Sequence, residues 1–284
     1  MHVCADDRGW CETRPAMPTP ITARTSASLV LDLATYLTEC YAAVPLVTAA
    51  LAGLREPPRR RGAGLHLGLI ETALDPRLAD LCGASLIVAN FAGTTHPARA
   101  LVDHGTYSAS LLVGQGRRHV LGLVPRAHLS VVLVAEGSGV ARPSVVARAI
   151  DWLSTRTTLV ALPLGTTAWD DELAAGIDRA HARGVRVFAA AGNLHPQPIL
   201  FPARHAGAIA VAALDGAGRL SADGCRWPAL DLTAPGVGIP GAIDDDRAEW
   251  RSGSSVACVV AAGLQCLCAS SRSPPACVPV TAAT

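Results

Sequence analysis

The stretch Ser252-Gly253-Ser254-Ser255-Val256-Ala257-Cys258 continues into the apolar run VVAAGL at residues 259–264, near the C-terminal end of the chain. A Gly-Ser-Ser turn that leads into an apolar helix places a hydroxyl group at the helix N-terminus, where unpaired N–H groups and the helix dipole stabilise negative charge. The apolar run from 256 to 268 is too short to span a membrane and predicts a helix buried on all sides. Taken alone, the turn is typical of a simple N-cap, so the chemical role of Ser255 depends on the rest of the chain.

The composition is that of a globular protein with a sizeable core. The chain has 284 residues, of which 50% are hydrophobic, and its formal net charge is +1. A charge balance so near neutrality gives no electrostatic reason to expect nucleic acid or a membrane surface as a partner. The nine cysteines include no Cys-x-x-Cys pair, which favours free thiols in a reducing compartment over a disulfide scaffold or a zinc site.

The sequence predicts a cytoplasmic location. The start of the chain carries Asp6, Asp7 and Glu12 where a secretory signal needs a basic region followed by an apolar run. The apolar stretch at 28–54 contains Asp32 and Glu39, so a transmembrane span is not expected.

We predict three regions along the chain. Residues 1–62 form an N-terminal extension, poorly ordered at its start, with one or two helices at 27–54 that are interrupted near Pro45. The extension ends in a basic, Pro-rich linker in which Arg59–Arg61 are expected to be solvated. Residues 63–269 form the main domain, and residues 270–284, rich in Ser, Pro and Ala, form a disordered tail.

Short apolar runs alternate with helical patterns through the main domain. Helices are predicted over 144–155 and 171–183, the second with Asp170 as its N-cap. This alternation indicates an α/β fold with a mostly parallel sheet and helices on both faces, in which sites form at the carboxyl ends of the strands. The predicted buried strands are Leu65–Ile70, Ser85–Ala89, Leu129–Val134, Thr158–Leu164, Val185–Ala190 and Ala208–Leu214.

Three polar residues at the ends of these elements are candidates for chemistry. Glu71 ends the first apolar strand, His104 opens an apolar helix, and Asn193 follows the strand at 185–190 through a glycine. Each has an ordinary structural explanation when taken alone: a solvated carboxylate, a capping or core histidine, and a turn asparagine. Their order along the chain, with Ser255 last, carries more information than any one of them.

In this order the motifs resemble those of the subtilisin-like serine proteases, the subtilases. The resemblance covers residues 64–265: an acid after an apolar strand, then His-Gly-Thr at 104–106, Ala-Ala-Gly-Asn at 190–193, and Ser-Gly-Ser-Ser-Val-Ala at 252–257. Further similar segments are GLVPRA at 122–127, FPA at 201–203 before the strand at 208–214, and LTAPG at 232–236. The resemblance implies a subtilisin-like three-layer fold.

The resemblance also implies roles for individual residues. Ser255 would be the nucleophile, His104 the general base and then the general acid, and Glu71 the acid that orients His104. Asn193 would donate its side-chain amide to the oxyanion, together with the backbone N–H of Ser255. The pocket for the residue before the scissile bond would be flanked by Leu164 and Gly165 on one side and by Ala190, Ala191 and Gly192 on the other, where glycine lets a substrate strand approach closely.

The implied chemistry requires no cofactor. Many subtilases bind structural calcium, but no convincing loop of oxygen ligands is found in the sequence, and Asp244–Asp246 are interpreted as a solvated turn. The implied partner is a peptide or protein substrate, and the oligomeric state is left open.

The chain departs from the family pattern most clearly at Glu71, where subtilases have Asp. A carboxylate of either length can orient an imidazole, but the extra methylene of Glu must be absorbed by a different rotamer or a strand shift. Neither Asp75 nor Asp103 is expected to take this role. Cys258, one turn beyond Ser255, is interpreted as a packing residue.

The sequence favours a serine endopeptidase that acts through an acyl-enzyme, of the intracellular type that processes precursor peptides, because the stretch at 104–116 is similar to that subgroup. The alternative is a pseudoprotease that binds peptides without turnover, since Glu71 is unusual and few residues follow the nucleophile. A nucleotide-binding domain is disfavoured because no Gly-x-Gly-x-x-Gly follows a strand, and an α/β-hydrolase because Ser255 is not within Gly-x-Ser-x-Gly.

Overall fold

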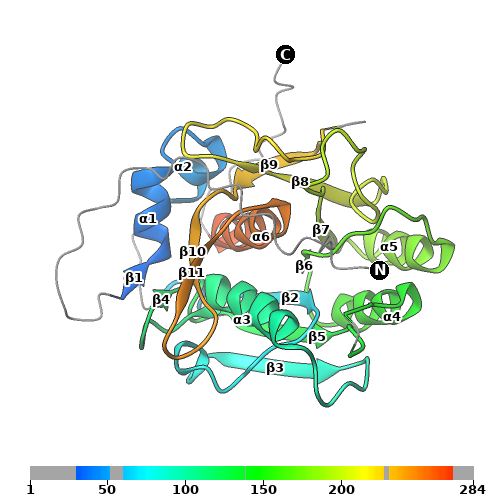
Figure 1. Ribbon diagram of the computed structural model, residues 1–284, viewed down its shortest axis with the longest axis horizontal. Helices are drawn as coiled ribbons and strands as arrows, with labels where there is room; N and C mark the ends of the chain where they lie inside the picture. The colour runs from blue at the N-terminus through cyan, green and yellow to red at the C-terminus, as the bar shows by residue number, and fades with distance from the viewer. Residues whose placement is uncertain (1–29, 52–59, 138, 227–229, 271–284) are drawn as a thin grey trace.

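A seven-stranded parallel sheet forms the centre of the molecule (Figure 1). The computed structural model describes residues 30–51, 60–137, 139–226 and 230–270. The strands lie in the order β3-β5-β2-β6-β7-β8-β9 and all neighbouring pairs are parallel. Their bounds are Ser85–Asn90 for β3, His128–Leu133 for β5, His66–Glu71 for β2, Leu159–Leu162 for β6, Arg186–Ala190 for β7, Ala208–Leu214 for β8 and Leu232–Pro235 for β9. The predicted parallel α/β fold is confirmed.

Successive strand residues enter two separate hydrophobic cores, which makes the domain three layers thick. In β6, Leu159 and Ala161 belong to one core, whereas Val160 and Leu162 belong to the other. Side chains of a strand point alternately to the two faces of its sheet, so a strand that is apolar throughout must be covered on both. Helices α4 (Pro143–Ser154) and α5 (Asp171–Ala182) cover one face, and α1, α2, α3 and α6 cover the other (Figure 1).

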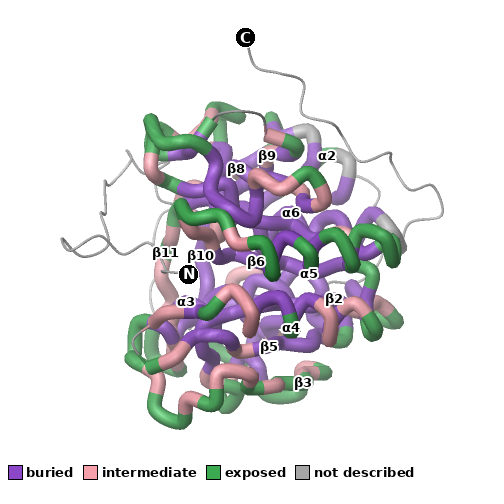
Figure 2. The backbone as a smooth tube through the Cα atoms, turned by 90° about the vertical axis from the view of Figure 1, so that its right-hand side faces the viewer, coloured by how far each residue is buried: buried purple, intermediate pink, exposed green. Residues whose placement is uncertain are grey.

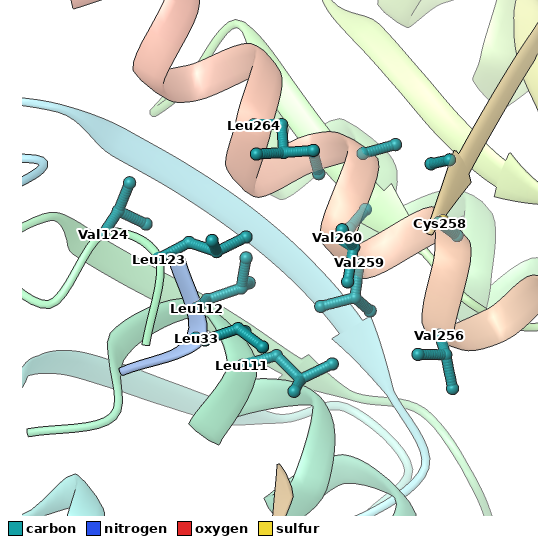
Figure 3. Close-up of a cluster of buried hydrophobic side chains, with 14 of the residues drawn as sticks. Leu33, Leu111, Leu112, Leu123, Val124, Val256, Cys258, Val259, Val260 and Leu264 are labelled. Atoms are coloured by element: carbon teal, nitrogen blue, oxygen red, sulfur yellow. The ribbon is translucent and has the colours of Figure 1, made fainter. Parts of the chain in front are cut away.

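The helix that follows Gly253 is deeply buried in the core. This helix, α6 (Ser254–Ser270), is buried at every position from 256 to 268 (Figure 2). Leucines from other elements, including Leu33, Leu111 and Leu123, point toward its apolar side chains (Figure 3). The prediction of a helix buried on all sides is therefore confirmed.

The N-terminal helices belong to the same core as α6. They are α1 (Leu33–Cys40) and α2 (Pro45–Leu51), separated just before Pro45 as predicted. Asp32 caps α1 by accepting from the N–H of Ala34 at 3.1 Å, and its carboxylate also pairs with Arg61 at 2.6 Å. The prediction that Arg61 is solvated is wrong: its side chain is buried, because the charge of Asp32 gives it a partner inside the protein. The rest of that linker, 52–59, and the terminal segments 1–29 and 271–284 lie outside the described residues.

The remaining strands and helices agree with the sequence pattern in most places. Asp170 caps α5 by accepting from the N–H of Leu173 at 2.9 Å, as predicted. The prediction that the strand at 85–89 is buried is wrong, because β3 is the edge strand and Ile87 is 54% exposed (Figure 2). Pro235, in the LTAPG segment, ends β9 at the opposite edge of the sheet, where a proline need not donate to a further strand.

Two small sheets complete the fold. Strands β10 (Ile239–Ala242) and β11 (Ala248–Arg251) form an antiparallel hairpin, and β1 (Leu31–Asp32) pairs in parallel with β4 (Val120–Leu121). The turn of the hairpin contains the three consecutive aspartates, of which Asp244 pairs with Arg247 at 2.8 Å. Within the described residues, no helix combines the length and the apolar character that crossing a bilayer requires.

A buried carboxylate holds the chain between α3 (Arg99–Val113) and β4 in place. Asp80, in the short 3-10 helix η2 (Ala79–Leu81), is fully buried, and its side-chain oxygens accept from four successive backbone N–H groups. The four donors belong to residues 117–120 and lie 2.7–2.9 Å from the carboxylate oxygens. Because buried N–H groups are costly to leave unpaired, this one side chain fixes the conformation of the whole loop.

We predict that Asp80→Ala destabilises the protein strongly. The substitution leaves four backbone N–H groups without their acceptor, and we expect the free energy of unfolding to fall by at least about 3 kcal/mol. Denaturant unfolding of the wild type and the variant measures the difference. Asp246→Ala, which removes an exposed aspartate of the hairpin turn, is the control and should change stability little. Equal stability of the two variants would contradict the role of Asp80.

Candidate active site

The carboxylate of Glu71 is completely buried at the carboxyl end of β2. It has no exposed surface, and each of its two oxygens accepts hydrogen bonds. Oε2 accepts from the backbone N–H of Thr72 at 2.9 Å and lies 2.8 Å from Nδ1 of His104. Oε1 accepts from the hydroxyl of Ser108 at 2.6 Å. A buried charge is tolerated only when it is paired and hydrogen-bonded, so the surroundings of Glu71 are built for an ionised carboxylate.

The imidazole of His104 faces this carboxylate from α3. The prediction that His104 opens its helix is wrong, because α3 begins at Arg99 and His104 lies within its second turn. Since a carboxylate only accepts, Nδ1 carries the proton of the His104–Glu71 hydrogen bond, and Nε2 is the nitrogen with a lone pair. The side chain is 7% exposed. This tautomer and this burial are what a general base beside a hydroxyl requires.

The close approach of α3 to the end of β2 depends on Gly105. A Cβ atom at this position would lie 1.8 Å from the carbonyl oxygen of Ala73 and 3.3 Å from Cβ of Glu71. Only a residue without a side chain allows the helix to lie this near to the strand end. The glycine that follows His104 is therefore required by the Glu71–His104 contact.

Each of the two neighbouring aspartates pairs with an arginine. Asp103 pairs with Arg99 at 2.6 Å, on the exposed side of α3. Asp75 pairs with Arg77 at 3.1 Å, and although partial burial raises its pKa, the hydrogen bonds and charge of Arg77 outweigh this and hold the pKa below its usual value. The prediction that Glu71, and not Asp75 or Asp103, is the acid beside the histidine agrees with these contacts.

Asn193 is fixed against the start of α6 by a reciprocal pair of hydrogen bonds. The N–H of Ser254 donates to Oδ1 of Asn193 at 2.8 Å, and the N–H of Gly192 donates to Oγ of Ser254 at 2.9 Å. Because Oδ1 is the acceptor, the orientation of the amide is defined, and its donor group Nδ2 adjoins Gly253. These two hydrogen bonds join the segment after β7 to the start of α6. The Nδ2 group of Asn193 then faces the residues that precede the helix.

Ser255 is the second residue of α6 and is half-buried. The turn before it requires glycine, since Gly253 has a φ of 139°. Helices α3 and α6 pack against one another, so His104 and Ser255 lie on contacting helices. Cys258, one turn farther along, is fully buried and donates to the carbonyl of Phe188 at 3.2 Å. Burial raises the pKa of the Cys258 thiol well above its usual range, which supports its interpretation as a packing residue.

The two predicted flanks of the substrate pocket face each other across Leu200. The segment containing Leu164 and Gly165 follows β6. The neighbouring strand, β7, ends at Ala190 and is followed by Ala191 and Gly192. Cβ atoms built on Gly165 and Gly192 would lie 2.9 Å and 2.6 Å from side-chain carbons of Leu200. Leu200 is held there by its N–H, which donates to the carbonyl of Ala191 at 2.8 Å. A leucine side chain therefore fills the space between the two glycines.

Sequence reasoning did not identify Ser108, Ser254 or Leu200. Ser108 lies one helical turn after His104, a spacing that places two side chains on the same face of a helix, and this was a usable signal. Ser254 was visible only as part of the Gly-Ser-Ser turn. Leu200 is brought between the pocket flanks by the loop after Asn193, for which the sequence pattern gave no signal.

Asp80 and Asp244 are paired with groups of the protein itself. No group of three or more His, Cys, Asp or Glu side chains converges among them. The buried Asp80 carboxylate faces four N–H donors, whose positive ends would repel a cation. Asp244 is occupied by Arg99 and Arg247, at 2.7 Å and 2.8 Å. No step of the chemistry below involves a metal.

Comparison with known proteins places this site in a family context. The profile of the Subtilase family matches residues 62–278. The chain is 31% identical over 166 residues to "Thermostable alkaline protease" of Halalkalibacterium halodurans. The matched region covers 58% of this chain and 46% of that protein. It is 30% identical over 210 residues to "Subtilisin Savinase" of Lederbergia lenta, which covers 72% of this chain and 76% of that protein. The chain spans about half the length of the first curated relatives it matches, 46% and 54%.

Solved structures with the same fold include two maturation proteases. A mutant of the protease domain of PatA has a TM-score of 0.66 at 22% identity, covering 74% of this chain and 80% of that one. The "Prenylagaramide maturation protease PagA" has a TM-score of 0.66 at 22% identity, covering 79% of this chain and 80% of that one. At this identity the likeness establishes the fold, and the predicted subtilisin-like three-layer architecture is confirmed.

We predict that Gly105→Ala separates the acid from the base. The added methyl group collides with the backbone of Ala73, so α3 must move away, and we expect a loss of about 2 kcal/mol or more in stability. Proton NMR detects the imidazole proton of His104 that is bonded to Glu71, and this signal should be lost. Gly137→Ala is the control, because its Cβ would meet nothing within 4 Å. A variant with native stability and an unchanged imidazole signal would contradict the prediction.

Proposed function

The chain belongs to the subtilase family, and from that premise we propose that it is a serine endopeptidase with Ser255, His104 and Glu71 as its catalytic triad. The observation that supports this most directly is the buried hydrogen bond of 2.8 Å between Glu71 Oε2 and His104 Nδ1. It supports glutamate as the acid of the triad, because Glu71 keeps contact with His104. The helix that carries Ser255 packs against the helix that carries His104.

The proposed reaction proceeds through an acyl-enzyme. The Oγ of Ser255 forms a bond to the carbonyl carbon of the substrate while its proton passes to Nε2 of His104, and the carbonyl oxygen takes the displaced electron pair. When the tetrahedral intermediate collapses, the C–N bond breaks and the leaving amine takes the proton from His104. Water then attacks the ester carbon while its proton passes to Nε2 of His104. The bond between the acyl carbon and Oγ breaks, Oγ takes the proton back from His104, and the product leaves as a carboxylic acid.

The developing oxyanion needs donors that are already in place. The Nδ2 group of Asn193 and the backbone N–H of Ser255 at the start of α6 are the proposed pair. The bond from Ser254 N–H to Asn193 Oδ1 supports this, because it fixes the amide with its donor group near the turn. One such donor contributes about 3 kcal/mol of transition-state stabilisation, a magnitude that comes from a subtilisin.

We propose that the substrate is a precursor peptide with a small residue before the scissile bond. Two structural neighbours are maturation proteases by name, and the stretch at 104–116 is similar to that subgroup in sequence. The size of the side chain is argued from Leu200, which occupies the space between Gly165 and Gly192. Glycine and alanine fit beside that leucine, whereas an aromatic side chain requires it to move.

A reducing compartment such as the cytoplasm is proposed as the location. Six described cysteines, Cys40, Cys82, Cys225, Cys258, Cys266 and Cys268, are all free thiols. Burial raises the pKa of Cys225 and of Cys258, so these two are poor thiolate nucleophiles and persist as packing residues.

Covalent labelling distinguishes an active protease from a peptide-binding module that does not turn over. A fluorophosphonate reacts with an activated serine by forming an O–P bond and releasing fluoride, and we expect one label per chain, located on Ser255 by mass spectrometry. Ser255→Ala should abolish labelling, whereas Ser254→Ala should leave the label on Ser255, at a reduced rate because the N–H of Gly192, next to Asn193, loses its acceptor. A folded wild-type protein that is not labelled would establish the pseudoprotease instead.

Shortening Leu200 tests the proposed substrate preference. With peptide substrates that differ only at the residue before the cleaved bond, the wild type should favour alanine over phenylalanine. Leu200→Ala should reverse or level this preference, with a change of roughly 10–200-fold in the ratio of kcat/KM values. Leu230→Ala serves as the control, because Leu230 is a partly buried leucine at the margin of the core that contains Leu164 and Ala191. A preference for alanine that survives in Leu200→Ala would refute the assignment.

A further inference from the structure

The acid of the site differs from an aspartate by one methylene group, and this adds a rotatable bond. A free glutamate side chain loses conformational entropy when it is fixed. A carboxylate that is not fixed presents its oxygens to His104 at variable angles, and displacement by about 1 Å can reduce turnover on the order of a hundredfold. Some other group must therefore hold the carboxylate of Glu71.

Ser108 is in the position to do this. Its hydroxyl lies 2.6 Å from Oε1 of Glu71, and both residues are buried, at 3% and 0% exposed. Oε1 accepts from Ser108, whereas Oε2 accepts from Nδ1 of His104, from the N–H of Thr72 and, at 3.4 Å, from the hydroxyl of Thr72. The two carboxylate oxygens are thus held by two residues one helical turn apart on α3, and the carboxylate lies along the face of that helix.

The hydroxyl of Ser108 has two acceptors within reach and only one proton to donate. The carbonyl oxygen of His104, one turn earlier, lies 3.0 Å from Oγ, and Oε1 of Glu71 lies 2.6 Å from it. Hydrogen bonds to charged acceptors are shorter and roughly twice as strong as neutral ones. The proton is therefore directed to Glu71, and the contact with the His104 carbonyl keeps the hydroxyl close to the helix.

We infer that Ser108 is a positioning residue for the triad, and that it fixes the plane of the Glu71 carboxylate so that Oε2 faces Nδ1 of His104. It acts through Glu71 and touches neither substrate nor the reacting atoms. The inference rests on the proposed function for its kinetic consequence, whereas the geometric consequence for His104 is independent of turnover. The hydrogen bond between Glu71 and Ser108 compensates for the extra methylene group of glutamate. The two residues therefore act as a pair.

The first experiment compares Ser108→Ala with Ser110→Ala. Ser110 is a matched control because it is fully buried on the same helix, donates to the carbonyl of Tyr107 at 2.7 Å and accepts from the N–H of Ala242 at 3.0 Å, without contact to Glu71. We expect Ser108→Ala to lower kcat by roughly 10–100-fold with little change in KM. Ser110→Ala should lower stability at least as much and leave kcat unchanged. Equal effects of both variants on kcat would overturn the inference.

The second experiment tests whether the effect acts through Glu71. A shorter acid in Glu71→Asp reaches toward Ser108 less far, so Ser108→Ala should reduce kcat by a smaller factor in that background than in the wild type. A factor that is the same in both backgrounds would show that the two residues are independent and would overturn the inference. Ser108→Thr, which keeps a hydroxyl, should retain more activity than Ser108→Ala.

Proton NMR separates failure of the inference from failure of the proposed function. The imidazole proton between His104 and Glu71 should shift and exchange faster with solvent in Ser108→Ala, and should be unchanged in Ser110→Ala. This result is expected whether or not the protein cleaves peptides. An unchanged imidazole signal in a folded Ser108→Ala variant would refute the positioning role, whereas absence of fluorophosphonate labelling in the wild type would refute the proposed function alone.

Discussion

The buried carboxylate of Glu71 is the constraint on which the site depends. A charge without exposed surface needs hydrogen-bond donors on both oxygens, and these come from the chain just after β2 and from two turns of α3. To bring α3 within reach, position 105 must be glycine and the helix must lie against the backbone of Ala73. The location of His104 is therefore a consequence of satisfying Glu71, and the site forms only when the sheet and α3 are already packed.

Helix α6 connects this site to the stability of the molecule. Its first residues hold Asn193 and carry Ser255, and its remainder is deeply buried in the core. Because protein interiors are close-packed, the start of the helix has little freedom to move. The same apolar residues that hold the fold together thus place the serine. A rigid support of this kind suits chemistry in which donors must be oriented before charge develops.

Much of the architecture could be predicted from local patterns. The apolar runs gave the positions of six of the strands in the central sheet, and Asp170 and Pro45 marked the starts of helices, because capping and chain stiffness are properties of a few neighbouring residues. Errors arose where the environment is set by distant parts of the chain. Ile87 is exposed because β3 ends the sheet, and Arg61 is buried because Asp32 lies opposite it. Neither fact is encoded in the residues adjacent to them.

The sequence by itself determined the order of the polar residues at the ends of the elements, and with it the family and the identity of Glu71, His104, Asn193 and Ser255 as candidates. Only the tertiary structure decided how they are held. Ser108 supports the glutamate, Ser254 orients the asparagine, and Leu200 fills the space between the pocket flanks. The physical reason is that hydrogen bonds and van der Waals contacts act over a few ångströms in space, between residues that are far apart along the chain, and no local pattern records which of them will meet.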